Sequence, residues 1–332
     1  RIGVDLAKNV FQVHGVDSHE RVVLRRALSR TKLRGFFAQL PPCLIGMEAC
    51  GSAHYWAREL EQLGHQVRLM APQFVSPYRK NDKNDGNDAE AICEALGRPT
   101  MRFVPIKGTE QQAVLCVHRA RSLLVAERTA LVNQIRGLLS EYGIVVGQGV
   151  SRLRRALPEV LEDADNGLPA LARGVFAERY THLRALDGRI EDYDRRLSTL
   201  AQQMAPARRL MQVPGVGPLT ATAVVASAGD ARVFRNGRQF AAWLGLVPRQ
   251  QSSGGKARLG RITKRGDVYL RTLLVHGARS VLCRPGEGPR DRWAQALVQR
   301  RGFNKAAVAL AAKQARLLWA LLAHQDDYRP AP

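Results

Sequence analysis

The sequence predicts an N-terminal α/β domain, a long helical segment and a mainly α-helical C-terminal domain within its 332 residues. Three observations indicate this organisation. Short apolar runs with turn-length gaps fill the first part, Arg- and Leu-rich helical sequence follows from about Gly108, and glycine-rich, basic sequence follows Pro206. A chain of this length has room for two or three domains. We therefore expect domains at residues 1–107, 108–205 and 206–332.

The first three apolar runs predict an antiparallel meander of strands. They span Ile2–Leu6, Phe11–Val16 and Val22–Leu28, and the gaps between them contain Lys8-Asn9 and Asp17-Ser18. Short apolar runs separated by turn residues are typical of neighbouring strands. A helix over Thr31–Leu40 should follow, because Pro41 and Pro42 end it.

Two further strands and two helices complete the predicted domain. Cys43–Met47 is a short apolar run that ends at Glu48, and Gln66–Met70 is another. The helix between them carries Trp56 and Leu60, with Ser52 as its expected cap and Gly64 as its end. A last helix begins near Asp85. The order βββαβαβα is that of an RNase H-like domain, which would place the fourth strand beside the first.

The central segment predicts a helical seam. Its apolar residues step by three and four, as in a heptad repeat: Leu183, Leu186, Ile190, Tyr193, Leu197, Leu200 and Met204. This spacing favours a coiled coil, either a helical hairpin or a contact between subunits. An ordinary amphipathic helix within a bundle is the alternative.

The charge of the chain points to nucleic acid as its partner. There are 51 Lys and Arg against 29 Asp and Glu, a formal charge of +22, which suits a polyphosphate. No apolar run approaches the roughly 18 residues of a membrane span and no secretory signal is visible, so we expect a cytoplasmic bacterial protein. The five cysteines are scattered and never in a CxxC spacing, which predicts reduced, mostly buried thiols.

Four carboxylates fall where the predicted topology would bring them together. Asp5 lies within an apolar strand, where an acid is costly without a cation or partner. Glu48 ends the neighbouring strand, and Asp85 and Asp88 share one face of a helix start. Such oxygen ligands suit one or two Mg²⁺ ions. Taken singly, the helix acids could be caps or solvated, and Glu48 could pair with an arginine.

Two C-terminal motifs suggest phosphate contacts. VPGVGPLTATAV resembles a helix-hairpin-helix turn, with Gly215 and Gly217 in the turn and Thr220 opening the helix, although a purely structural turn fits too. Residues 248–267 form a polar, glycine-rich loop, which could hold a nucleophilic serine or be only flexible. Residues 249–301 hold thirteen Lys or Arg against three acids. The expected nucleic-acid contacts are Gly215, Gly217, Thr220, Arg249, Lys256, Arg258, Arg261, Lys264 and Arg265.

These motifs together resemble the IS110/IS1111 family of transposases. The resemblance rests on IGVDLAK, IGMEACGSAHYW, DxxDA at 85–89, VPGVGPLTA and FAAWLGLVPRQQSSGGKARLGRITKRGDVYLR, and it covers nearly the whole chain. It implies a RuvC-like DEDD domain with Asp5, Glu48, Asp85 and Asp88 as catalytic metal ligands, and a C-terminal transposase domain. The family's catalytic serine corresponds to Ser253, which has Ser252 beside it.

The resemblance also implies an activity and partners. Such an enzyme would be a Mg²⁺-dependent DNA recombinase of an insertion sequence, acting through a covalent phosphoserine link to donor and target DNA. A noncoding bridge RNA would guide it, and dimers would assemble into a tetramer. Two alternatives remain: a Holliday-junction-resolving nuclease that uses a metal-activated water and no serine, and a nucleic-acid-binding module with a degenerate acidic site.

Overall fold

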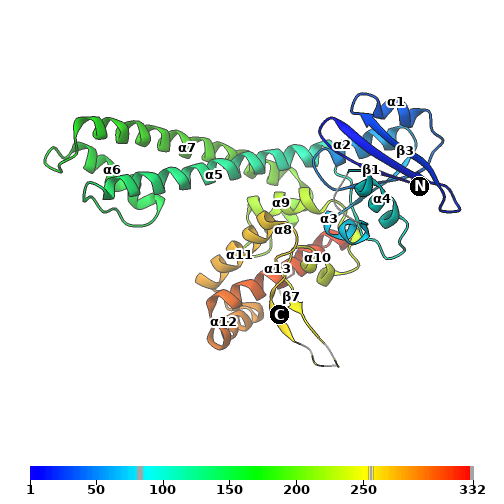
Figure 1. Cartoon of the computed structure of the whole chain (residues 1–332). Coiled ribbons are helices and arrows are strands. Elements are labelled where there is room, and N and C mark those ends of the chain that lie inside the picture. The colour runs from blue at the N-terminus through cyan, green and yellow to red at the C-terminus, as the bar shows by residue number, and fades with distance from the viewer. Residues whose placement is uncertain (81–84, 253, 255, 257, 330–332) are drawn as a thin grey trace. The chain divides into compact units, whose positions relative to one another are not determined.

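The computed structural model describes residues 1–80, 85–252, 254, 256 and 258–329, and leaves the Asp85 side chain undescribed. The chain forms two compact units (Figure 1). One comprises Arg1–Gln111 with Ala228–Val233, and the other comprises Gln112–Ser227 with Phe234–Pro332. The boundary at Gln111 lies close to the end of the first predicted domain. The further division at residue 205 stays a prediction.

A six-stranded mixed sheet organises the N-terminal unit. The strand order is β3-β2-β1-β4-β5-β6, and the strands are β1 (Ile2–Asp5), β2 (Val10–Val16), β3 (Val22–Ser29), β4 (Leu44–Glu48), β5 (Gln66–Met70) and β6 (Phe103–Val104). β1 pairs antiparallel with β2 and parallel with β4. The predicted meander and the placement of the fourth strand beside the first are confirmed.

Helices cover both faces of this sheet. They are α1 (Leu33–Ala38), α2 (Ala53–Gln62), α3 (Pro72–Val75), the 3₁₀ helix η1 (Ser76–Tyr78) and α4 (Asp85–Leu96). Strand side chains alternate between faces, and Val4 and Met47 belong to the core cluster that holds α2 residues such as Leu60. Gly3 and Gly46 precede these two residues and are paired with each other across the strands. They face α4 instead.

The start of α2 differs from its prediction. Ser52 occupies the N-cap position, but it has a left-handed φ of 67° and its side chain makes no capping hydrogen bond. Ser52 lies in a turn in which the Cys50 amide donates to the Glu48 carbonyl at 2.8 Å and the Ala53 amide donates to the Cys50 carbonyl at 3.3 Å. The helix ends at Gln62, shortly before Gly64, whose φ is +88°.

Long antiparallel helices follow. α5 (Thr109–Ser140), α6 (Val150–Glu162) and α7 (Ala170–Gln203) share one core cluster. Arg121 pairs with Asp194 and Arg128 pairs with Asp187, so α5 and α7 run antiparallel. Four predicted seam residues are buried, namely Leu183, Leu186, Ile190 and Leu197. The seam therefore faces the neighbouring helices, whereas a true coiled coil stays a prediction.

The C-terminal part is mainly helical. Its elements are α8 (Ala205–Met211), α9 (Pro218–Ala228), the 3₁₀ helix η2 (Ala231–Val233), α10 (Gly237–Trp243), α11 (Val268–Cys283), α12 (Pro289–Arg301) and α13 (Phe303–His324). Among the described residues, α13 alone is long and apolar enough to span a membrane. This differs from the expectation that no apolar segment approaches the length of a membrane span. It packs against α8, α10, α11 and α12, as expected of a central core helix.

The cysteines depart from their prediction. All five are free, yet only Cys93 is buried, while Cys50, Cys116 and Cys283 are exposed and Cys43 is intermediate. The expectation of mostly buried thiols was therefore wrong. Composition alone does not distinguish a helix face that meets the core from one that meets solvent.

Candidate metal centre and nucleic-acid interface

Asp5 and Glu48 end two adjacent parallel strands. The register pairs Ile2 with Ile45 and Val4 with Met47, and continuing it by one residue sets Asp5 opposite Glu48. Both residues are partly exposed. Although Cys50 is exposed as a residue, partial desolvation of its thiol raises the thiol pKa, and the negative charges of Glu48 and Asp5 raise it further. The two carboxylates therefore act on one small volume at this edge of the sheet.

The helix α4 approaches the same volume with its N-terminal end. A Cβ atom on Gly3 would collide with the Ala89 carbonyl and would lie 2.5 Å from the Cys93 amide nitrogen. Arg1, two residues earlier on the strand side, donates from Nε to the Cys93 carbonyl at 3.1 Å. β1 and α4 therefore run in opposite directions, and the end of β1 at Asp5 lies toward the start of α4. That start holds the remaining two acids, Asp85 and Asp88.

Asp88 has an arginine as its partner. It is 7% exposed, and its Oδ1 accepts a hydrogen bond from Arg79 Nε. A buried carboxylate requires such a partner or a cation. Asp85 opens α4, and its side chain lies outside the described part of the structure.

The chemistry and the positions of the four acidic residues can be compared with the ligands that a metal ion needs. Among the described side chains, which do not include that of Asp85, no group of three His, Cys, Asp or Glu residues is arranged to hold an ion. Asp5 and Glu48 supply carboxylate oxygens, the ligands that hard divalent cations prefer. Asp5 and Glu48 alone supply part of the ligand set that such an ion needs.

Two short strands within the predicted glycine-rich loop form a basic β-hairpin. β7 (Pro248–Gln250) pairs antiparallel with β8 (Leu259–Ile262). Both strands are largely exposed, so they lack the alternation of buried residues that would have predicted them. The six predicted basic contacts are all exposed here: Arg249, Lys256, Arg258, Arg261, Lys264 and Arg265.

Of the two serines in this hairpin, only Ser252 can be described. Its Oγ accepts a hydrogen bond from Gln250 Nε2 at 2.9 Å, and its side chain is exposed. Ser253, the predicted nucleophile, lies outside the described residues.

The glycine-rich turn between α8 and α9 packs tightly inside its domain. Gly215 has φ +85°, and a Cβ there would lie 2.6 Å from the Gly277 carbonyl of α11. Gly217 is exposed, whereas Thr220 is 5% exposed. The helix begins at Pro218 rather than at Thr220. The Thr220 side chain is therefore part of the interior, and Gly217 is the turn glycine that solvent reaches.

A buried polar chain was missed by the sequence analysis. His118 of α5 is 1% exposed, and its ring nitrogens lie 3.0 Å from Tyr269 Oη and 3.0 Å from Thr222 Oγ1. Burial, followed by the charge of Arg121, lowers the pKa of His118 to about 4. These residues are more than a hundred positions apart from His118, so nothing local in the sequence connects them.

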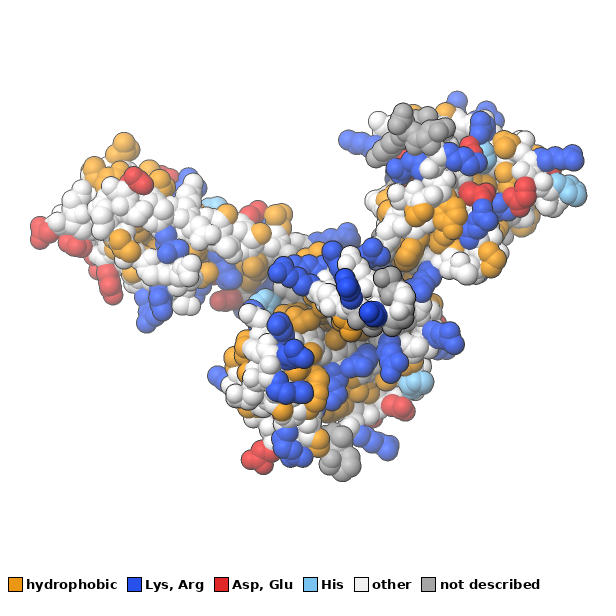
Figure 2. All heavy atoms as spheres, turned by 60° about the horizontal axis from the view of Figure 1, so that its bottom comes forward, with side chains coloured by type: hydrophobic (Ala, Val, Ile, Leu, Met, Phe, Trp, Pro, Cys, Tyr) orange, Lys and Arg blue, Asp and Glu red, His pale blue; other side chains and the backbone are white. Residues whose placement is uncertain are grey.

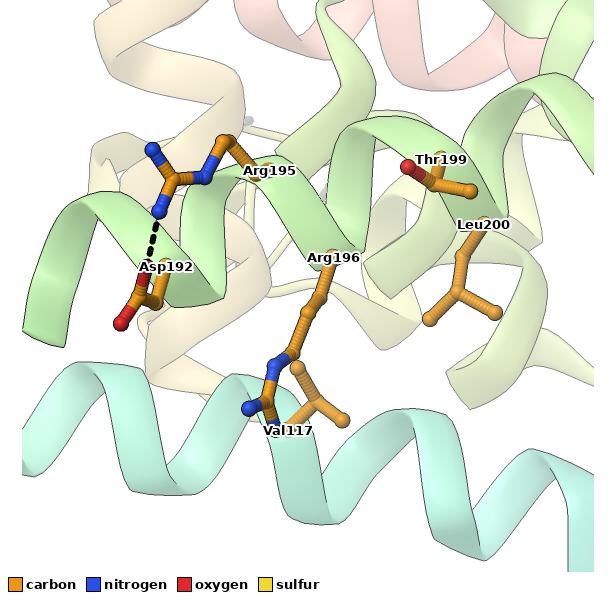
Figure 3. Close-up of a pocket in the computed structure, with 6 residues that line it drawn as sticks. All are labelled: Val117, Asp192, Arg195, Arg196, Thr199 and Leu200. Atoms are coloured by element: carbon orange, nitrogen blue, oxygen red, sulfur yellow. Dashed lines mark hydrogen bonds and ion pairs between the residues drawn. The ribbon is translucent and has the colours of Figure 1, made fainter.

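A hollow of about 570 Å³ lies between α5 and α7 (Figure 3). Val117 and Leu200 supply apolar lining, and the arginines at its edge already have partners. Arg195 pairs with Asp192, and the guanidinium of Arg196 lies 5.4 Å from the Tyr193 ring centroid. We assign this hollow no ligand.

Basic side chains dominate one view of the C-terminal helices. Figure 2 shows Lys and Arg gathered over this part, with few acidic side chains among them. Phosphate groups are attracted to such a surface.

Comparison with known proteins identifies two matching families. Residues 207–294 match the "Transposase IS116/IS110/IS902 family". Residues 2–144 match the DEDD transposase family of IS110 elements, described as "Transposase". The first match covers the basic hairpin, and the second covers the acidic residues of the sheet edge.

Full-length relatives are similar to the chain. A "Probable family 20 transposase" of Pseudomonas aeruginosa is 58% identical over 99% of this chain and 98% of its own length. The transposase for insertion sequence element IS1111A of Coxiella burnetii is 45% identical, over 99% and 91%. The transposase for IS1328 of Yersinia enterocolitica is 42% identical, over 96% and 95%.

Proposed function

The chain belongs to the IS110/IS1111 family of insertion-sequence transposases, and we propose that it cuts and rejoins DNA with an acidic metal site and a serine. The family makes it a DNA-processing enzyme. The observations that support the proposal are the adjacent ends of β1 and β4, which set Asp5 beside Glu48, and the packing of α4 against Gly3 of β1.

The acidic residues would hold one or two Mg²⁺ ions. Asp5, Glu48, Asp85 and Asp88 would be the ligands, in an RNase H-like arrangement. Bound there, the metal would supply electrostatic stabilisation of charge on the phosphate oxygens. For Asp88 to serve as a ligand, its Oδ1 must exchange the Arg79 guanidinium for the cation. Arg79 then keeps Asp88 neutralised whenever the ion is absent.

Ser253 would be the nucleophile. Its Oγ would form a bond to a DNA phosphorus while the phosphorus–oxygen bond to the neighbouring sugar breaks, and the departing DNA hydroxyl would take up the proton. The phosphoserine bond conserves the phosphodiester, so a DNA hydroxyl can later reverse the step and rejoin a strand.

The exposed basic hairpin, with Arg249, Arg258 and Arg261 among its cations, would bind phosphates. Donor and target DNA are the proposed substrates, with a bridge RNA as guide. The chain would act as dimers assembled into a tetramer, and the helices α5 and α7 are the proposed assembly element. The acids and the serine would come from different domains, so both domains would be needed for the reaction.

A denaturing gel tests the serine. Labelled DNA carrying the ends of the insertion sequence is incubated with protein and Mg²⁺, then separated in detergent. We expect an adduct that survives denaturation with wild type and with Ser252→Ala, and none with Ser253→Ala. Cleavage without any adduct would instead support a junction-resolving nuclease. Binding without cleavage would support a binding module with a degenerate site.

A further inference from the structure

The base of the β7–β8 hairpin contains a buried arginine. Arg271, in the first turn of α11, is 9% exposed. Its Nη1 donates to the carbonyl of Leu244 at 3.1 Å and to that of Arg265 at 3.5 Å. None of the ion pairs between described residues involves Arg271. A buried guanidinium is costly unless its donors are used, so this placement demands a reason.

In the sequence, one of the two carbonyl groups precedes the hairpin and the other follows it. Leu244 ends α10 and precedes β7, whereas Arg265 follows β8. One guanidinium therefore contacts both legs of the hairpin and ties them to α11. The planar fork of arginine suits two acceptors at once, which a lysine ammonium cannot match.

The legs also meet each other directly at this point. The Lys264 amide donates to the Gly245 carbonyl at 3.1 Å, and the Thr263 amide donates to the Val247 carbonyl at 2.9 Å. Gly245 and Gly266 have φ of +73° and +91°, and a Cβ on either would collide with the opposite leg. The base is thus a close-packed backbone junction with little freedom to shift.

The helix that carries Arg271 is itself fixed. The Asp267 side chain caps α11 by accepting from the Leu270 amide at 3.0 Å. Tyr269 Oη lies 3.0 Å from His118 of α5. Arg271 therefore links the hairpin to a helix whose own position is fixed.

We propose that Arg271 is a positioning residue that sets the direction of the hairpin carrying the serines, which rests on the proposed serine chemistry. From Pro248 to Ser252 an extended chain spans about 13 Å, because a strand rises about 3.3 Å per residue. A tilt of about 10° at the base would then move Ser252 by about 2 Å. A misplacement of about 1 Å can cost a reaction about 100-fold in rate.

The test combines a structural and a kinetic measurement on the full chain. Arg271→Met keeps the length of the side chain but removes its donors, and Arg271→Lys keeps only the charge. Arg279→Met is the control, because Arg279 is exposed on the same helix and donates to Asn304 at 2.7 Å. Hydrogen exchange is followed for the peptide containing the Thr263 and Lys264 amides. Adduct formation is timed at saturating DNA, alongside DNA affinity.

We expect exchange at the hairpin base to rise about 10-fold or more in both Arg271 variants. The adduct rate should fall about 100-fold, while DNA affinity changes by less than about 3-fold and α13 stays protected. Arg279→Met should match wild type. If Arg271→Met fails to fold, Arg271→Lys decides the outcome.

Two results would overturn the inference. Unchanged protection of Thr263 and Lys264 would show that Arg271 does not hold the base. Lost protection with an unchanged adduct rate would show that the base does not position the serine. A wild-type protein that forms no adduct would refute the proposed function instead, while the exchange measurement would still test the contact.

Discussion

At the scale of single residues, His118 shows how burial selects a protonation state. Thr222 Oγ1 donates to the Pro218 carbonyl at 2.7 Å, so toward His118 it can only accept. His118 Nε2 therefore carries the hydrogen, and Nδ1 accepts from Tyr269. Both nitrogens of the neutral ring are satisfied, and a protonated ring would lose the bond from Tyr269.

This arrangement predicts a pH-dependent stability. The pKa of His118 falls from 6.5 to about 4 on folding, so between these values the unfolded chain binds the extra proton. The free energy of unfolding should be fully retained above about pH 6.5. It should decrease as the pH falls, by up to about 3 kcal/mol near pH 4.

The measurement is urea unfolding at several pH values for wild type and His118→Gln. Glutamine can accept from Tyr269 and donate to Thr222 without titrating, so its pH slope in this interval should be smaller. Identical slopes for the two proteins would show that His118 does not titrate as expected.

Arg79 gives a second residue-scale prediction. Arg79→Met leaves Asp88 buried without its cation, so the free energy of unfolding should fall by about 1–3 kcal/mol without metal. Saturating Mg²⁺ should restore more of that loss than it adds to wild type, because the ion no longer competes with a guanidinium. Thermal unfolding with and without Mg²⁺ measures both effects.

Arg25→Met is the matched control. Arg25 pairs with Glu90 of the same helix, but its side chain is 66% exposed, so its loss should change stability by less than about 1 kcal/mol. Equal stabilisation of wild type and Arg79→Met by Mg²⁺ would mean that Arg79 does not compete for Asp88.

At the scale of elements, close backbone contacts set the helix positions. Gly277 of α11 faces Gly215, and a Cβ on Gly277 would collide with the Gly215 carbonyl. We expect Gly277→Ala to lower the free energy of unfolding by about 1–3 kcal/mol, since the backbone must move. Gly188 on α7 has open space around its Cβ position, so Gly188→Ala should stabilise by about 0.5–1 kcal/mol. Chemical denaturation separates the two, and stabilisation by Gly277→Ala would refute the contact.

The elements that sequence could predict are those with a clear pattern of burial. β1 and β4 are apolar runs with defined ends, and their pairing follows from topology, so the approach of Asp5 and Glu48 was predictable. The strands β7 and β8 are exposed on both faces and gave no periodic signal. The two-residue strand β6 was too short to detect.

The contacts that sequence could not give are long-range. Asp88 was expected to face a metal ion, and its partner Arg79 directly follows a short 3₁₀ helix whose position no local sequence pattern predicts. The role of Arg271 depends on carbonyl groups, which carry no side-chain signature at all. Predicting such contacts requires the backbone path first.

At the scale of the whole molecule, the charge of +22 should govern DNA affinity. The logarithm of the binding constant should fall linearly with the logarithm of salt concentration. Replacing Arg258 and Arg261 by glutamine should reduce that slope by about 2, since each phosphate contact contributes about 0.9. Arg184→Gln, an exposed change on α7, should leave the slope unchanged. Fluorescence anisotropy at several salt concentrations measures the slope. An unaltered slope in the double variant would show that the hairpin does not contact DNA phosphates.

The central claim is that the acidic site and the serine serve one reaction. The most direct test measures the covalent protein–DNA adduct as a function of Mg²⁺ concentration for wild type, Asp5→Asn and Ser253→Ala. We predict a Mg²⁺-dependent adduct with wild type only, joined through the peptide that contains Ser253. DNA binding should be retained by both variants. An adduct formed by Asp5→Asn at the wild-type rate, or one that needs no divalent ion, would contradict the account.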